Sequence, residues 1–322
     1  MQDLMPSAQA AIDIGSNTIH VVVARYAAEG LDIEENEEEV VRIGASVTAT
    51  GEISPEKCDA AITTLQRYKE LAQKHRAKPI LVVATEAIRQ ARNNADFVER
   101  VRRETGLHVQ LISGTAEAVL TFLGATYENM THDAPSQLGV MDLGGGSMEI
   151  VTANGKQITW RTSLPLGSGW LHDRYLPSNP PSSDELTGAR TFLKNFLEDA
   201  QFLNCPPMLI VTGGSANALL QLARRAQGLD QKNNQLTIDN LLQCETLLRT
   251  LTAEEVSQYY QLSLNRSRIL LAGLLIIQAV LEHLHLTNFY VSSHGIREGA
   301  LLAYKQYGEH WLELVSRDSS AQ

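Results

Sequence analysis

The residues of this 322-residue chain that are best suited to chemistry lie in and just before two short polar turns. Each turn follows an aspartate at the end of a β-rich segment: Asp13 before Gly15, Ser16, Asn17 and Thr18, and Asp142 before Gly144, Gly145, Gly146 and Ser147. Successive backbone amides in such a turn can bind an anion, and a carboxylate can ligate Mg²⁺ directly or through water. Either turn alone could be a tight hairpin whose aspartate bonds its own backbone. The pair favours two phosphate-binding turns, each with an acidic cation ligand.

The two turns open two similar strings of elements. Residues 11–15 (AIDIG) match residues 140–144 (VMDLG), and a β-branched segment follows each turn. Strands are predicted at 10–14, 19–26, 39–43, 80–84 and 107–112, and again at 137–143, 148–152, 158–163, 208–212 and 289–292. Residues 34–39, rich in glutamate, are predicted to form a solvated turn. Strands alternate with helices later in each half, which indicates a duplicated α/β fold.

The helices of this alternation have recognisable start signals. Ser54-Pro55 provides an N-cap and a proline at the first helical position. Further helices are predicted at 85–91, 94–105, 115–126, 183–203 and 296–304. The apolar segment 269–281 is too short for a membrane span of about 20 residues and reads as a buried core helix.

Composition excludes several other classes. The formal charge of −10 disfavours nucleic-acid binding, which needs a basic surface. There is no P-loop, no nucleophile elbow and no zinc-protease motif. Cys58, Cys205 and Cys244 lie far apart without metal-ligand spacing. No secretory signal is evident, so we expect a cytoplasmic protein with no membrane or nucleic-acid partner.

The sequence resembles a known family, that of exopolyphosphatases and guanosine pentaphosphate phosphohydrolases. The resemblance extends from about Ala10 to Tyr304. Its segments are AAIDIGSNT, VVATEAIRQARN, LISGTAEAVLTFLGA, GVMDLGGGSMEIV, LPLG, VTGGSANALL and SSHGIREGALLAY. It implies a duplicated ribonuclease-H-like fold, shared by actin, heat-shock ATPases and sugar kinases, with a cleft between two domains. The first domain would comprise residues 1–126 and a C-terminal helix at about 297–322, and the second residues 127–296.

The resemblance also implies roles for individual residues. Glu117 falls on the catalytic glutamate that activates water, and Asp142 and Glu149 on acidic residues that bind Mg²⁺ (or Mn²⁺) and assist catalysis. Asp13 falls on the acidic residue of the first phosphate turn. Arg89 falls on an arginine that contacts phosphate, and Gly213 with Gly214 on the nucleotide-side turn. The implied substrate is inorganic polyphosphate or, as an alternative, guanosine pentaphosphate, which would connect the protein to the stringent response.

Some residues depart from the family pattern. After Pro165-Leu166-Gly167 the family usually has a small or apolar residue and then an arginine, but this chain has Ser168-Gly169-Trp170. In addition, Gly44-Ala45-Ser46 replaces G-E-G, and His294 replaces Asp or Ser. The chain resembles a short form without extra C-terminal domains, in which a homodimer would extend the binding groove. A noncatalytic sensor of polyphosphate or guanosine tetraphosphate, and a sugar or acetate kinase, remain alternatives.

Overall fold

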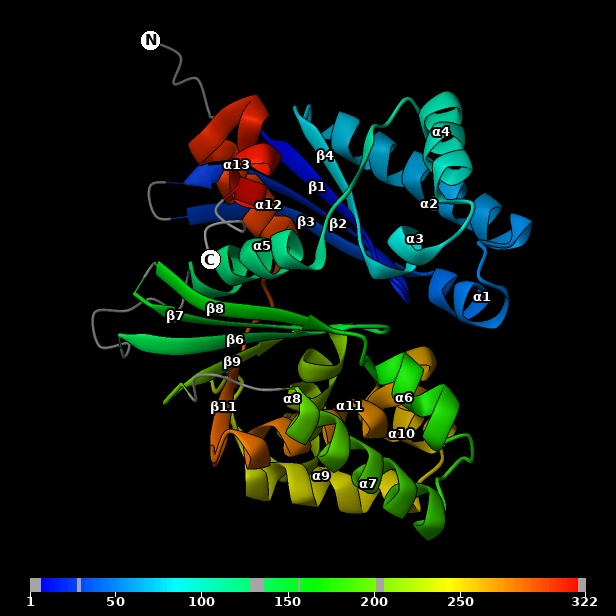
Figure 1. Ribbon diagram of the computed structural model, residues 1–322, viewed down its shortest axis with the longest axis vertical. Coiled ribbons are helices and arrows are strands. Elements are labelled where there is room, and N and C mark those ends of the chain that lie inside the picture. The colour runs from blue at the N-terminus through cyan, green and yellow to red at the C-terminus, as the bar shows by residue number, and fades with distance from the viewer. Residues whose placement is uncertain (1–6, 28–29, 128–135, 156, 201–205, 318–322) are drawn as a thin grey trace. The chain divides into compact units, whose positions relative to one another are not determined.

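The computed structural model describes residues 7–27, 30–127, 136–155, 157–200 and 206–317 (Figure 1). The chain divides into two compact units: unit 1 comprises residues 1–132 and 294–322, and unit 2 residues 133–293. The domain limits expected after residues 126 and 296 stay a prediction. Cys205 and residues 318–322 of the expected C-terminal segment lie outside the described residues.

The described part of unit 1 contains one five-stranded mixed sheet in the order β3-β2-β1-β4-β5. Its strands are β1 (Gln9–Ile14), β2 (Thr18–Ala27), β3 (Gly30–Val40), β4 (Ile80–Ala84) and β5 (Val109–Leu111). β1, β2 and β3 form an antiparallel meander, whereas β4 runs parallel to both β1 and β5. The carboxyl ends of β1, β4 and β5 therefore lie at one edge of the sheet.

Helices cover both faces of this sheet (Figure 1). They are α1 (Ile43–Thr50), α2 (Pro55–Lys74), α3 (Glu86–Gln90), α4 (Asn94–Thr105), α5 (Gly114–Thr126), α12 (Ile296–Tyr307) and α13 (Trp311–Arg317), with a 3₁₀ turn at Gly308–His310. Ser54 caps α2 by accepting a hydrogen bond from the Lys57 amide, as its sequence predicts. Leu65 and Tyr68 of α2 then pack on the β1 and β2 side chains in one core.

The described part of unit 2 repeats this arrangement in a six-stranded sheet, with the order β10-β11-β9-β6-β7-β8. The strands are β6 (Gln137–Leu143), β7 (Met148–Asn154), β8 (Gln157–Leu164), β9 (Leu209–Thr212), β10 (Gln235–Thr237) and β11 (Asn288–Val291). Read as β8-β7-β6-β9-β11, the order matches β3-β2-β1-β4-β5, with the same antiparallel meander and parallel pairs. β10 is an additional edge strand. The predicted duplicated α/β fold of ribonuclease-H-like type is confirmed.

A helical layer packs on the sheet of unit 2. Its helices are α6 (Ser168–Tyr175), α7 (Ser183–Asp199), α8 (Gly214–Gln227), α9 (Ile238–Thr250), α10 (Ala253–Tyr260) and α11 (Leu264–His283). Among the described helices, only α11 is long and apolar enough to cross a membrane by length and composition alone. Most of α11 is buried in the core of unit 2, which agrees with the core helix predicted for residues 269–281.

The glutamate-rich segment is where the prediction of a turn was wrong. Residues 34–39 lie inside the edge strand β3. The strand expected at 39–43 is also misplaced, since β3 ends at Val40 and α1 begins at Ile43. Basic side chains neutralise the strand: Arg25 Nε lies 2.5 Å from Glu34 Oε1, and Arg67 Nη2 lies 3.0 Å from Glu39 Oε2. The Arg25 hydrogen bond lowers the pKa of the Glu34 carboxyl. Charge on an edge strand also discourages pairing with another chain.

Two glycines allow α5 and α12 to pack with their backbones in contact. A Cβ atom on Gly299 of α12 would overlap the Leu120 carbonyl of α5, and one on Gly124 of α5 would overlap the Gly295 carbonyl. The Tyr26 hydroxyl of β2 also donates a 2.8 Å hydrogen bond to the Leu301 carbonyl. The helix α12 therefore belongs to unit 1, where it packs directly on α5, the helix that contains Glu117.

We predict that Gly299→Ala destabilises the protein by about 3 kcal/mol, because the added methyl group overlaps backbone atoms that cannot rotate away. Gly188→Ala is the matched control: Gly188 lies on the exposed face of α7, with open space where a Cβ atom would be, so alanine should stabilise the helix by up to about 1 kcal/mol. Urea unfolding of both variants measures the difference. Equal free energies of unfolding would contradict this packing.

Candidate functional site

The first predicted phosphate turn, residues 15–18, connects β1 to β2 in unit 1. The Gly15 amide donates to the Thr18 carbonyl at 3.0 Å, which closes the turn. The Ser16 carbonyl accepts from the Gly44 amide at 2.7 Å, and the Asn17 carbonyl accepts from the Arg42 amide at 2.9 Å. The turn is thus held from outside by Arg42, which lies between β3 and α1 and has a positive φ of 59°, and by the first turn of α1.

The second predicted turn, residues 144–147, has the same construction in unit 2. The Gly144 amide donates to the Ser147 carbonyl at 3.1 Å. The Gly144 carbonyl accepts from the Ser168 amide at 3.0 Å, and the Gly145 carbonyl from the Trp170 amide at 2.9 Å. The internal repeat therefore extends beyond the strands to the way in which each turn is fixed.

In unit 1, Arg89 and Glu117 follow the neighbouring parallel strands. The Thr85 amide, just after β4, donates to the Ile14 carbonyl at 3.3 Å, so this segment lies beside the end of β1. Ser113 caps α5 by accepting from the Ala116 amide at 3.1 Å. Because the carboxyl ends of parallel strands share one edge, the structure brings Asp13, Arg89 and Glu117 to the same edge of the sheet, where ligands of open α/β sheets bind.

Glu117 is a buried carboxylate in the first turn of α5. It is 6% exposed, and a buried carboxylate requires charge compensation. Arg89 supplies part of it, since its Nη1 atom lies 3.7 Å from Glu117 Oε2, and the α5 amino terminus adds a favourable dipole. Nη1 of Arg89 also donates to the Ile112 carbonyl at 2.6 Å, and its guanidinium pairs with Glu86. Arg89 therefore fixes the segment that presents Glu117, in addition to any contact with phosphate.

In unit 2 the two predicted acidic residues are direct cross-strand neighbours. Asp142 of β6 is paired with Glu149 of β7, and Glu149 with Ser163 of β8. Side chains paired in this way share one face of the sheet, and like charges directly opposite each other are destabilising. The Ser163 hydroxyl donates to Glu149 Oε1 at 2.7 Å, which fixes the orientation of that carboxylate.

This acidic pair fits a divalent cation such as Mg²⁺ or Mn²⁺. Within the described residues, no three His, Cys, Asp or Glu side chains converge as a metal site. The two carboxylates of Asp142 and Glu149 nevertheless suit Mg²⁺, which keeps several waters and binds through one or two carboxylates plus substrate phosphates. Asp142 and Glu149 would hold the cation in unit 2. Asp13 is placed at the end of β1 in unit 1, where it faces His20 of β2 in the strand register.

The Gly213-Gly214 turn lies beside Asp142. Thr212 of β9 pairs with Asp142, and Gly213 has a φ of +100°, a conformation that favours glycine. A Cβ atom on Gly213 would lie 3.2 Å from Asp142 Oδ1, and one on Gly214 would overlap the guanidinium of Arg266. Sequence reasoning missed Arg266, the third residue of α11, because only the packing of α11 on α8 brings a cation to this turn.

The structure also places the residues that depart from the family pattern. Trp170 packs on Phe192 of α7 with ring centroids 5.4 Å apart, and the Arg174 guanidinium lies 5.8 Å from its ring. The ring therefore packs within the helical layer of unit 2, while the backbone amide holds the turn. His294 packs edge-on against Tyr127 at 5.1 Å. These contacts give both residues a packing role.

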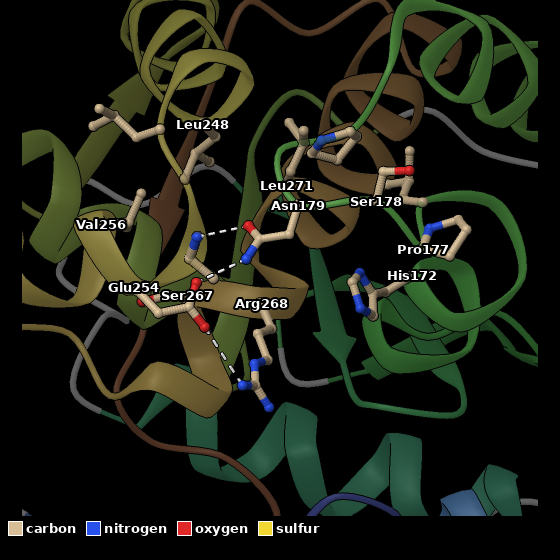
Figure 2. A pocket seen from close by; sticks show the side chains of 14 residues that line it. His172, Pro177, Ser178, Asn179, Leu248, Glu254, Val256, Ser267, Arg268 and Leu271 are labelled. Atoms are coloured by element: carbon tan, nitrogen blue, oxygen red, sulfur yellow. Dashed lines mark hydrogen bonds and ion pairs between the residues drawn. The ribbon is translucent and has the colours of Figure 1, made fainter.

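A separate cavity of about 160 Å³ lies in the helical layer of unit 2 (Figure 2). Leu176, Leu248, Val256 and Leu271 form apolar parts of its wall. On the polar side, Asn179 donates to Glu254 Oε2 at 2.7 Å and accepts from the Ala253 amide at 2.7 Å, while Arg268 lies 3.5 Å from Glu254 Oε1. A backbone amide, followed by Asn179, lowers the pKa of the Glu254 carboxyl. None of the predicted site residues lines this cavity.

Comparison with known proteins assigns the family. The sequence model of the Ppx/GppA phosphatase family matches residues 22–307. The chain belongs to the Ppx/GppA phosphatase family. Exopolyphosphatase 1 of Mycobacterium leprae is 26% identical over 298 residues, which cover 90% of this chain and 87% of that protein. Exopolyphosphatase 1 of Mycobacterium tuberculosis is also 26% identical over 298 residues, covering 90% of this chain and 86% of that protein.

Solved structures agree with this assignment. The Aquifex aeolicus PPX-GPPA enzyme shares 29% sequence identity and has a TM-score of 0.76, with 92% of this chain and 99% of that chain covered. An exopolyphosphatase from Cytophaga hutchinsonii, 23% identical with a TM-score of 0.84, shares the fold over 93% of this chain and 98% of its own. As a member of the Ppx/GppA phosphatase family, the protein is a phosphatase and hence a hydrolase.

We predict that Asp142→Asn raises the free energy of unfolding in EDTA by up to about 1 kcal/mol, because it removes the repulsion with Glu149. The same variant should lose most of the stabilisation that millimolar Mg²⁺ or Mn²⁺ gives the wild type. Thermal unfolding with and without the cation measures both effects. Glu198→Gln, at an exposed carboxylate of α7, should change neither. A cation-dependent shift of wild-type size in Asp142→Asn would contradict a metal site at this pair.

Proposed function

We propose that this Ppx/GppA family member is an exopolyphosphatase that hydrolyses the terminal phosphoanhydride bond of inorganic polyphosphate and releases orthophosphate. The observation that carries the proposal is the buried Glu117, presented at the amino terminus of α5 with Arg89 3.7 Å away. The relatives named exopolyphosphatase over most of the chain favour polyphosphate as the substrate.

Glu117 would act as the general base. A carboxylate within hydrogen-bond reach of a water molecule can remove its proton as the water attacks phosphorus. Attack on the terminal phosphorus forms the new P–O bond while the bridging P–O bond breaks. The shortened chain leaves with the bonding electrons. Arg89, by holding both the Ile112 carbonyl and Glu117, would keep the carboxylate in the correct orientation.

The remaining residues would bind and neutralise the phosphate chain. Phosphoryl transfer depends chiefly on positioning and charge stabilisation. The turns 15–18 and 144–147 offer backbone amides and hydroxyl groups to phosphate oxygens. Mg²⁺, held by Asp142 and Glu149, would supply neutralisation of the negative charge that develops on those oxygens. Asp13 is proposed as a further cation ligand, in unit 1.

Guanosine pentaphosphate remains the alternative substrate, because the same groups would act on its terminal phosphate. A noncatalytic sensor is not favoured, because a sensor needs no buried carboxylate at Glu117 and the chain retains Glu117, Asp142 and Glu149 together. A cytoplasmic location and a homodimer stay predictions.

We predict that the wild type releases orthophosphate from polyphosphate with Mg²⁺ present, and that Glu117→Gln lowers kcat by about 10²–10⁴-fold, because an amide cannot take the proton. KM should change little, since glutamine keeps the size of the side chain. Phosphate release would be measured on long polyphosphate, tripolyphosphate and guanosine pentaphosphate, with EDTA as the metal-free control.

Glu86→Gln is the matched control, because Glu86 also pairs with Arg89 but is given no chemical role. Release from guanosine pentaphosphate alone would assign the alternative substrate. Release from polyphosphate that Glu117→Gln retains in full would exclude Glu117 as the base. Binding of every substrate without any release would leave the sensor.

A further inference from the structure

The carbonyl groups of both turns point toward the start of the helix that follows the third strand of the same unit. In unit 1 the Ser16 carbonyl accepts from the Gly44 amide at 2.7 Å, in the first turn of α1. In unit 2 the Gly145 carbonyl accepts from the Trp170 amide at 2.9 Å, and the Gly144 carbonyl from the Ser168 amide and hydroxyl at 3.0 and 3.2 Å. The helix-start amides are thus used to hold the turn.

These hydrogen bonds determine where the turn amides point. In a trans peptide the C=O and N–H groups point in opposite directions. The Ser16 carbonyl, bonded to Gly44, therefore directs the Asn17 amide away from α1. The Gly144 and Gly145 carbonyls likewise direct the Gly145 and Gly146 amides away from α6. In the part of the chain that the structure describes, these three amides donate to no protein acceptor.

The close approach of helix and turn requires glycine in both units. A Cβ atom on Gly44 would lie 2.9 Å from Ser16 Cβ, and a Cβ atom on Gly169 would lie 3.1 Å from the Gly145 carbonyl oxygen. A Cβ atom on Gly167 would overlap the backbone of Gly145 and Gly146. Any side chain at these positions must push the turn away from its helix.

We propose that Gly44 and Gly169 are positioning residues for the reaction, which fix the direction of the turn amides and hence the affinity for phosphate groups. This inference rests on the proposed function, because it assigns phosphate binding to the two turns. It also gives a role to two of the segments that depart from the family pattern, Gly44-Ala45-Ser46 and Ser168-Gly169-Trp170. In both segments backbone amides support the turn.

Gly169→Ala is the decisive variant, because it should stabilise the helix α6 but weaken phosphate binding by the turn. Alanine is a better helix former than glycine, so α6 itself should gain stability. The new methyl group nevertheless displaces the Gly145 carbonyl by a few tenths of an ångström. We expect KM for tripolyphosphate to rise about tenfold, since small misplacements of binding groups are costly. The value of kcat should stay within about twofold, and the melting temperature should not fall.

Gly188→Ala is the matched control, since it makes the same change in a helix of the same unit with nothing near the new methyl group. Gly44→Ala tests the turn of unit 1 independently and keeps the proposal testable if Gly169→Ala fails to fold. A rise in KM for Gly169→Ala or Gly44→Ala, absent in Gly188→Ala, supports positioning. KM values equal to that of Gly188→Ala in both folded variants would overturn it.

Calorimetric binding of tripolyphosphate in the presence of Mg²⁺ separates this inference from the proposed function. If the wild type releases no phosphate, the proposed hydrolysis fails, but binding still reports on the turns. An approximately tenfold weaker affinity of Gly169→Ala than of Gly188→Ala would then support positioning. Equal affinities, or the absence of binding by the wild type, would overturn it.

Discussion

Parallel pairing at the centre of each sheet is the constraint on which the candidate site depends. β4 runs parallel to both β1 and β5 in unit 1, and β9 runs parallel to both β6 and β11 in unit 2. Parallel strands place their carboxyl ends at one edge, so turns far apart in the sequence come together there. Asp13, Arg89 and Glu117 share one such edge, and Asp142 and Gly213 share the other.

The acidic groups at these edges make the fold less stable than a neutral site would. Asp142 and Glu149 face each other across two strands, and Glu117 is nearly fully buried. Such charges are retained where a cation or a polar ligand compensates them. Substrate and cation would therefore stabilise the folded protein by binding, which connects the chemistry of the site to its stability.

Glycine has three different roles in this chain. Gly124 and Gly299 allow two helices to touch, Gly213 supplies a positive φ beside Asp142, and Gly44 and Gly169 allow helices to approach the turns at residues 15–18 and 144–147. In each case the reason is the space or the conformation at that position. A glycine without such a neighbour, such as Gly188, has no comparable requirement.

The sequence by itself determined the repeat, most of the strands, the cap at Ser54 and the identity of the acidic turns, because these depend on local patterns of polarity and turn residues. It could not determine β3, whose glutamates look solvated until Arg25, Arg67 and His75 come near from other elements. Nor could it find the position of Arg266 against Gly214, or the roles of α1 and α6 in holding the turns. Those contacts join residues that only tertiary packing brings together, and no local pattern in the sequence encodes them.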